Sequence, residues 1–120
     1  MAAGTGPGNN EPVLEPDISV VVVAYDSGPD LLTCLRSARA ETETLGLRAE
    51  FIVVDNASAD GAPEEAAQAL PGLDLLRNAR NRGYGAAANQ GARHARGRRL
   101  LLLNPDARLV PGALGHLNSA

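Results

Sequence analysis

The 120-residue sequence predicts one α/β domain with a mainly parallel sheet and alternating helices. Three observations favour this class. Short apolar runs suited to strands recur four times, stretches with helical spacing separate them, and glycine, proline, asparagine or aspartate bound most segments. Strands that alternate with helices pair in parallel through right-handed crossovers. A chain of this length supports a single hydrophobic core.

The first 17 residues are rich in glycine, proline, asparagine and glutamate, and we expect residues 1–17 to be a disordered leader before a domain at 18–120. The run ISVVVVAY at 18–25 predicts a strand that is buried on both faces. A helix follows, with Pro29 at its start. Apolar residues recur along one face of that helix, and Cys34 is among them, so we predict a core cysteine rather than a nucleophile.

The alternation continues through the middle of the chain. EFIVVDN at 50–56 predicts a second strand, and 59–70 predicts a helix with Pro63 near its start. LDLLRN at 73–78 predicts a third, shorter strand. The alanine-rich stretch 83–97 predicts a helix that can lie very close to the sheet.

The last strand is predicted at 98–104, where four consecutive leucines end on Asn-Pro-Asp. A further helix is expected to begin at 111–117. No apolar run approaches the ~20 residues that span a bilayer, and the N-terminus does not have the pattern of a signal peptide, so we expect a cytoplasmic protein. The single cysteine excludes an internal disulfide and a cysteine-rich metal site.

Charge divides unevenly along the chain. Residues 1–76 hold 13 acids and 3 arginines, a net charge of −10, whereas 77–120 hold 8 arginines and one acid, a net charge of +7. The arginines either form a solvated basic surface or bind anions such as phosphates. Nucleic acid is not the expected partner, because only three aromatic residues could stack on bases. There is no lysine, which excludes a P-loop.

Polar residues follow every predicted strand, and ligands of parallel sheets bind at this carboxyl edge. Asp106 either caps the turn after Pro105 or ligates Mg²⁺ or Mn²⁺, hard cations that need only one or two protein carboxylates when phosphates supply the rest. Asp55 either caps the next helix or accepts hydrogen bonds from a nucleobase or a ribose hydroxyl.

GYGAAA at 83–88 matches the dinucleotide-binding fingerprint, but that fingerprint belongs directly after the first strand of its unit. Here it follows the third predicted strand. We therefore expect Gly83 and Gly85 to let the backbone approach the sheet or a ligand closely.

Three motifs follow one another along the chain: VVDNAS at 53–58, a spaced set of residues, and NPD at 104–106. The spaced set consists of Asn81, Gly83, Ala87, Asn89 and Gly91. In this combination the sequence resembles family 2 glycosyltransferases, in particular their bacterial rhamnosyltransferase-like branch. The resemblance covers 18 to about 117 and implies a GT-A fold whose first half binds a sugar nucleotide.

The resemblance also implies roles for individual residues. Asp55 would recognise the base or ribose, and Asn104 and Asp106 would stand at the family's DxD element, where the last acid reaches the donor diphosphate through Mg²⁺ or Mn²⁺. The other nucleotide-binding residues implied are Val23, Ala24 and Tyr25 at the nucleoside, and Asn81, Gly83 and Gly85 near the diphosphate.

The implied reaction is transfer of a sugar, with inversion, from a UDP- or dTDP-sugar to a saccharide or lipid-linked acceptor, at the cytoplasmic face of a membrane if the acceptor is lipid-linked. No acid follows Asp106, so we expect this chain to supply the donor and metal site, to lack the catalytic base and to be inactive alone. The alternatives are a nucleotide-binding module without chemistry, a nucleotidyltransferase and an NAD-binding domain.

Overall fold

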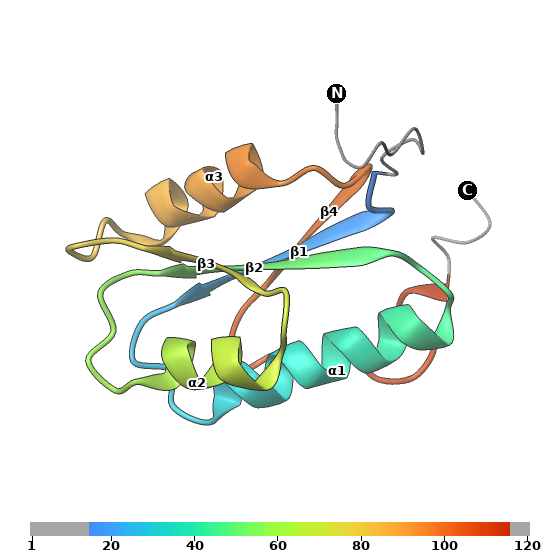
Figure 1. Ribbon diagram of the computed structural model, residues 1–120, viewed down its shortest axis with the longest axis horizontal. Coiled ribbons are helices and arrows are strands. Elements are labelled where there is room, and N and C mark those ends of the chain that lie inside the picture. Colours follow the sequence, from blue (N-terminus) through green and yellow to red (C-terminus); the bar gives the residue numbers. More distant parts are fainter. Residues whose placement is uncertain (1–14, 116–120) are drawn as a thin grey trace, which may run out of the picture.

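Four parallel strands form one sheet, and helices cover both of its faces (Figure 1). The computed structural model describes residues 15–115. The spatial order of the strands is β3-β2-β1-β4, which confirms the predicted fold class. In chain order the elements are β1 (Ile18–Ala24), α1 (Asp30–Thr44), β2 (Ala49–Asp55), α2 (Ala62–Ala69), β3 (Asp74–Arg77), α3 (Tyr84–His94) and β4 (Arg99–Leu103).

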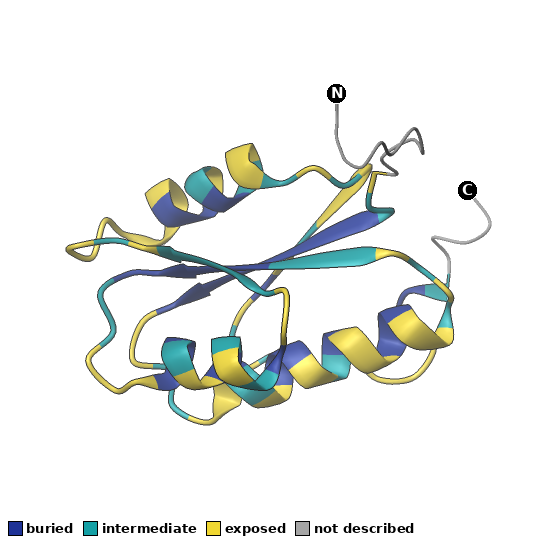
Figure 2. Cartoon of the chain, in the orientation of Figure 1, coloured by how far each residue is buried: buried dark blue, intermediate teal, exposed yellow. Residues whose placement is uncertain are grey.

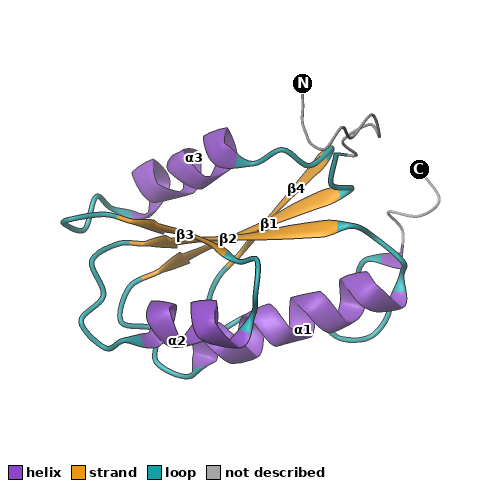
Figure 3. Cartoon of the chain, viewed as in Figure 1, coloured by secondary structure: helices purple, strands orange, loops and turns teal. Residues whose placement is uncertain are grey.

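The helices are divided between the two faces of the sheet, as Figure 3 shows, with α1 and α2 on one face and α3 on the other. The chain runs outward from β1 to β2 and β3, and then returns through α3 to β4 on the far side of β1. The strand order therefore reverses between β1 and β4. Such a reversal opens a crevice at the carboxyl ends of the strands.

Strand β1 is the centre of the core. All seven of its residues are buried, which confirms the prediction of a strand buried on both faces (Figure 2). Val20 and Val22 pack with α1 and α2, whereas Val21 and Val23 pack with α3. Two hydrophobic clusters are thus joined through the alternating side chains of one strand.

Two predicted helices are shorter than expected. Helix α2 begins at Ala62 rather than at 59, because Gly61 before it adopts a left-handed conformation with φ +75°. Helix α3 ends at His94 rather than at 97, because Ala95 is extended with ψ 142°. The observed bounds of each strand differ from the predicted bounds by at most one residue at either end.

The helix expected at 111–117 is not an α-helix over the residues that the structure describes. Residues 111–115 form turns, with Gly112 at φ +87°, and 116–117 lie outside the described residues. The Glu41 carboxylate of α1 accepts the N–H groups of Gly112 and Leu114, both at 3.0 Å. These two bonds hold the segment against α1, and the positive φ of Gly112 is what departs from helical geometry.

The segment expected to be a leader is described only at its end. Residues 15–17 lie beside the start of the sheet, where the Asp17 N–H donates to the Arg48 carbonyl at 2.7 Å and the Asp17 carboxylate accepts the Arg48 N–H. Residues 1–14 lie outside the described residues.

The prediction for Cys34 is confirmed, and the environment of His94 is also defined. Cys34 is fully buried, as predicted, and burial raises the pKa of its thiol to about 11. His94 is exposed and faces Asp74 at 3.3 Å. Among the helices in the described residues, none has the length and hydropathy needed to cross a bilayer.

The close approach of α3 to the sheet occurs at Gly91. A Cβ atom there would lie 2.5 Å from Val21 Cγ1 and 3.1 Å from Val54 Cγ2. We expected the approach at Gly83 and Gly85, but a Cβ at either position would meet no atom within 4 Å, so that expectation was wrong for the sheet. Gly83 has a φ of +85°, and a residue with a side chain would adopt this backbone conformation only under strain.

Gly91→Ala is expected to lower the free energy of unfolding by about 1–3 kcal/mol, because the added methyl overpacks the sheet. Gly85→Ala in the same helix is the matched control, and is expected to raise it by up to about 1 kcal/mol through helix propensity alone. Urea denaturation of both variants measures the difference. Equal stabilisation by the two substitutions would show that α3 does not lie this close to the sheet.

Candidate functional site

The predicted site residues lie at one edge of the sheet, where four parallel strands end. We call this edge the carboxyl edge; it consists of the segments that follow the strands, at 25–28, 55–60, 78–83 and 104–106. Ala24 at the end of β1 stands beside Asp55 at the end of β2 in the strand register. The parallel sheet therefore brings together residues as far apart in the sequence as 25 and 106.

Two acids of the carboxyl edge bind the loops to one another. The Asp26 carboxylate accepts the Ala59 N–H at 2.7 Å, and the Asp60 carboxylate accepts the N–H groups of Ala62 at 3.0 Å and Gly28 at 2.8 Å. The bonds from Ala62 and Gly28 hold the pKa of Asp60 below its usual value. Asp60 therefore uses both of its oxygens for structure, whereas Asp26 keeps Oδ2 without a hydrogen bond among the described residues.

Asp55 combines a structural contact with a free acceptor. It is buried, and its Oδ1 accepts the Ser58 N–H at 2.8 Å, so it closes the turn after β2. It does not cap the next helix, as one of its two predicted roles required, because α2 begins at Ala62 and its N-cap residue is Gly61. In the described part of the chain no hydrogen bond involves Oδ2. The second predicted role, as an acceptor for a base or ribose, is therefore compatible with this turn contact.

Asn56 is a buried residue whose role the sequence analysis missed. Its side-chain amide donates to the Gly83 carbonyl at 3.1 Å, while its Oδ1 accepts from the Asn78 side chain and from the Arg82 N–H, both at 3.1 Å. One side chain thus holds the loop between β3 and α3 at three points. The available signal was its place in VVDNAS, directly after a buried strand.

The loop held by Asn56 presents polar groups to solvent. Asn81 is exposed, and its Oδ1 accepts the Gly83 N–H at 2.7 Å. Arg80 and Arg82 are exposed, and neither forms an ion pair within residues 15–115. The loop leads into the N-terminus of α3, whose free N–H groups and dipole favour anions. This side of the carboxyl edge is electropositive.

The three predicted nucleoside residues differ in exposure. Val23 and Ala24 are buried, with Val23 in the cluster under α3. Tyr25 is about half exposed, at 54%. Of these three residues, only Tyr25 offers its side chain to a ligand at the surface. Gly85, in the first turn of α3, is exposed as well.

Asn104 and Asp106 occupy a tight turn that follows β4. The Ala107 N–H donates to the Asn104 carbonyl at 2.9 Å and closes the turn. Both polar side chains are exposed, and the Asp106 carboxylate accepts no hydrogen bond from any residue that the structure describes. The capping role that we considered for Asp106 is not observed.

The donor set at this turn fits a metal only if the substrate completes it. No group of three or more His, Cys, Asp or Glu residues that could hold a metal exists within 15–115. One free carboxylate and one amide oxygen remain, from Asp106 and Asn104. Mg²⁺ commonly binds through one or two protein carboxylates together with substrate phosphates. The turn is suited to an ion shared with a diphosphate.

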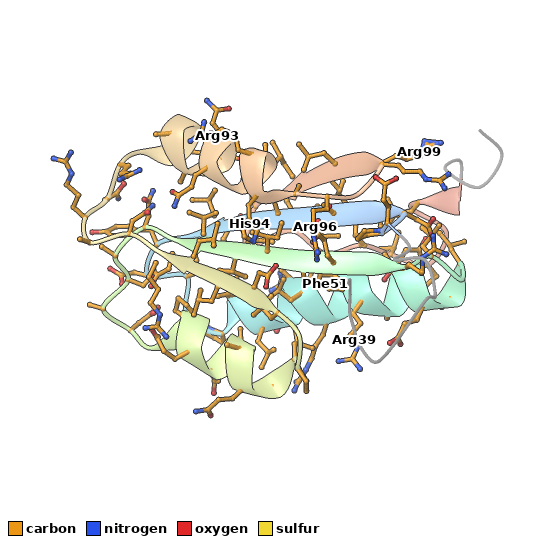
Figure 4. All side chains as sticks on the ribbon, turned by 45° about the horizontal axis from the view of Figure 1, so that its top comes forward. Arg39, Phe51, Arg93, His94, Arg96 and Arg99 are labelled. Atoms are coloured by element: carbon orange, nitrogen blue, oxygen red, sulfur yellow. The ribbon has the colours of Figure 1, made fainter. Side chains whose placement is uncertain are left out.

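Two other surfaces contain none of the predicted site residues (Figure 4). Arginines gather where α3 ends and β4 begins, and one of them, Arg96, pairs with Glu50 at 3.2 Å. A groove of about 380 Å³ lies below the amino end of β2, lined by Arg39 and Phe51 among others. Both surfaces are away from the carboxyl edge.

Comparison with known proteins gives related sequences. The chain is 38% identical over 108 residues to the succinoglycan biosynthesis protein ExoO of Rhizobium meliloti, covering 88% of this chain and 30% of that protein. It is 38% identical over 73 residues to an N-acetylglucosaminyl-diphospho-decaprenol L-rhamnosyltransferase of Mycobacterium tuberculosis, covering 61% of this chain and 23% of that protein. The chain spans less than a third of the length of these relatives.

Solved structures share the fold, which is that of GT-A glycosyltransferases. The mannosyltransferase PcManGT from Pyrobaculum calidifontis, in complex with GDP-Man and Mn²⁺, superposes with a TM-score of 0.70 at 29% identity, covering 88% of this chain and 32% of that one. TarS of S. aureus superposes with a TM-score of 0.69 at 22% identity, covering 86% and 31%. The family model described as "Glycosyl transferase family 2" matches residues 19–119, and the chain belongs to that family.

Proposed function

We propose that this chain binds the nucleoside diphosphate of a UDP- or dTDP-sugar at its carboxyl edge and supplies the metal-binding side of an inverting sugar transfer. The observation that carries the proposal is the Asp106 carboxylate, which is exposed beside the β1/β4 reversal and has no hydrogen bond of its own among the described residues. A related structure at 29% identity holds a sugar nucleotide with Mn²⁺, which supports a divalent cation as cofactor.

Each predicted nucleotide-binding residue of the carboxyl edge has a place in this proposal. The free Oδ2 of Asp55 accepts a hydrogen bond from the base or ribose, and the exposed ring of Tyr25 stacks on the base. The loop around Asn81, Gly83 and Gly85, next to the N-terminus of α3, faces the diphosphate. Val23 and Ala24 contribute the buried floor on which this pocket rests.

Asp106 and Asn104 would hold the cation together with the diphosphate, and a bound cation would supply positive charge to offset the charge on the departing nucleoside diphosphate. In an inverting transfer the acceptor hydroxyl attacks the anomeric carbon from the opposite side, and a base removes its proton. We assign the donor side alone to the residues of this chain. The similarity to a rhamnosyltransferase whose name gives a decaprenol-linked substrate supports a saccharide or lipid-linked acceptor. We propose that this acceptor is reached at the cytoplasmic face of a membrane.

Asp106→Asn is expected to remove the gain in UDP or dTDP affinity that Mn²⁺ provides, by about 10-fold or more, because it deletes the charged ligand. Calorimetric titration of the chain with each nucleotide, with and without Mn²⁺, measures this. Asp74→Asn is the control, since Asp74 is also a solvent-accessible aspartate but lies at the opposite end of a strand. If the Asp106 variant is destabilised while the metal dependence of its nucleotide binding is unchanged, the residue is structural. Retention of NAD instead of UDP or dTDP would contradict the proposed donor class.

Asn56→Ala is expected to weaken nucleotide binding with and without Mn²⁺ alike, because it releases the loop on the diphosphate side rather than the metal ligand. It also leaves buried polar groups without partners, so the free energy of unfolding should fall by about 1–3 kcal/mol. Gln68→Ala, at an exposed site on α2, is the control. Titration and urea denaturation measure both effects. If a destabilised Asn56→Ala variant keeps its metal-free nucleotide affinity, the loop that Asn56 holds does not contribute to the nucleotide site.

A further inference from the structure

A row of four polar side chains on α1 lies against the segment that follows β4. Their spacing along the helix is four, three and four residues, which places them on one face. Figure 1 shows the chain leaving β4 and passing along α1 toward the C-terminus. The members of the row are Asp30, Cys34, Ser37 and Glu41.

The far half of the row holds the chain beyond the turn. Ser37 Oγ accepts the Leu109 N–H at 3.1 Å. Glu41 is buried, and each of its carboxylate oxygens accepts one backbone N–H, from Gly112 and Leu114. These bonds tie the segment to a helix of 15 residues that is itself packed on the sheet.

The near half of the row meets the turn that carries Asp106. The Cys34 thiol lies 3.4 Å from the Asn104 carbonyl. The Arg108 guanidinium donates to two carbonyls of the turn, those of Pro105 at 3.2 Å and Ala107 at 2.8 Å, and its second terminal nitrogen donates to Asp30 Oδ1 at 2.8 Å. A single planar fork thus joins both sides of the turn to the first residue of α1.

This arrangement contributes little to stability as an ion pair. The Arg108 and Asp30 side chains are 36% and 53% exposed, and surface pairs of this kind are typically worth less than about 1 kcal/mol. Arg108 instead contacts the backbone on either side of Asp106, and Asp30 contacts Arg108. A site with a single protein carboxylate depends on where that carboxylate is held.

We propose that Asp30 and Arg108 are positioning residues that fix the Asp106 turn for a divalent cation shared with a nucleoside diphosphate. The inference rests on the proposed function, because it assigns Asp106 to the metal. Neither residue touches the ligand. Arg108 acts by holding the carbonyls of Pro105 and Ala107, and Asp30 acts by holding Arg108.

The test compares Arg108→Gln with Arg39→Gln. Arg39 also forms an exposed ion pair that involves α1, with Glu43 at 3.1 Å, but it lies nine residues beyond Asp30 along the helix and so is a matched control. UDP and dTDP are titrated with and without Mn²⁺. Arg108→Gln should reduce the Mn²⁺-dependent gain in affinity by about 10-fold to 100-fold, with metal-free affinity and melting temperature equal to those of Arg39→Gln.

Two further measurements sharpen the test. Asp30→Asn should show the same loss, and the double variant should lose no more than Arg108→Gln alone, because the two residues act as one unit. Amide hydrogen exchange at Ala107, whose N–H closes the turn, should be faster in Arg108→Gln than in Arg39→Gln. Arg108→Lys, which keeps the charge without the fork, should not restore the slow exchange.

Each outcome decides between the hypotheses. If Arg108→Gln keeps the metal dependence and the slow exchange of the control, the positioning role is wrong while the proposed function stands. If it lowers metal-free binding and melting temperature together, Arg108 is merely structural and the inference is overturned. If the unsubstituted chain binds neither nucleotide more tightly with Mn²⁺, the proposed metal site is wrong and the inference fails with it.

Discussion

The burial of β1 on both faces is the constraint on which the rest of the structure depends. A strand without any exposed residue requires a partner strand on each edge and a helix layer on each face, and β2, β4, α1 and α3 supply these. Since all four strands run parallel, this requirement also gathers their ends at one edge. The candidate site is a consequence of how β1 is buried, because the crevice forms where the chain turns back across that strand.

Most polar atoms at the carboxyl edge are used by the protein itself, and this distinguishes structural from available groups. Asp26 and Asp60 bind backbone N–H groups of neighbouring loops, and Asn56 uses both ends of its amide on the β3–α3 loop. Among the acidic groups of this edge, one oxygen each of Asp26 and Asp55 and both oxygens of Asp106 accept no hydrogen bond from the described residues. A rigid frame of satisfied groups around a few free ones is the arrangement expected of a preorganised binding site.

The order and type of the elements could be predicted because apolar periodicity and turn residues are local properties. The ends of α2 and α3 could not, since they depend on the left-handed Gly61 and on the extended Ala95. Asn56 was missed for a different reason: its partners lie 22 to 27 residues further along, and only the folded sheet brings them within reach. The predicted ligand contacts of the carboxyl edge remain predictions, because they concern molecules outside the fold.

The uneven charge along the sequence acquires a physical meaning in the fold. Arginines of the second half pair with acids of the first: Arg77 with Glu64, Arg96 with Glu50, and Arg108 with Asp30. Charges that are separated in sequence are thereby partly neutralised across contacts between the halves. Two arginines at the carboxyl edge, at 80 and 82, take no part in this pairing within residues 15–115. Their positive charge is therefore concentrated at the edge where a diphosphate would bring two or more negative charges.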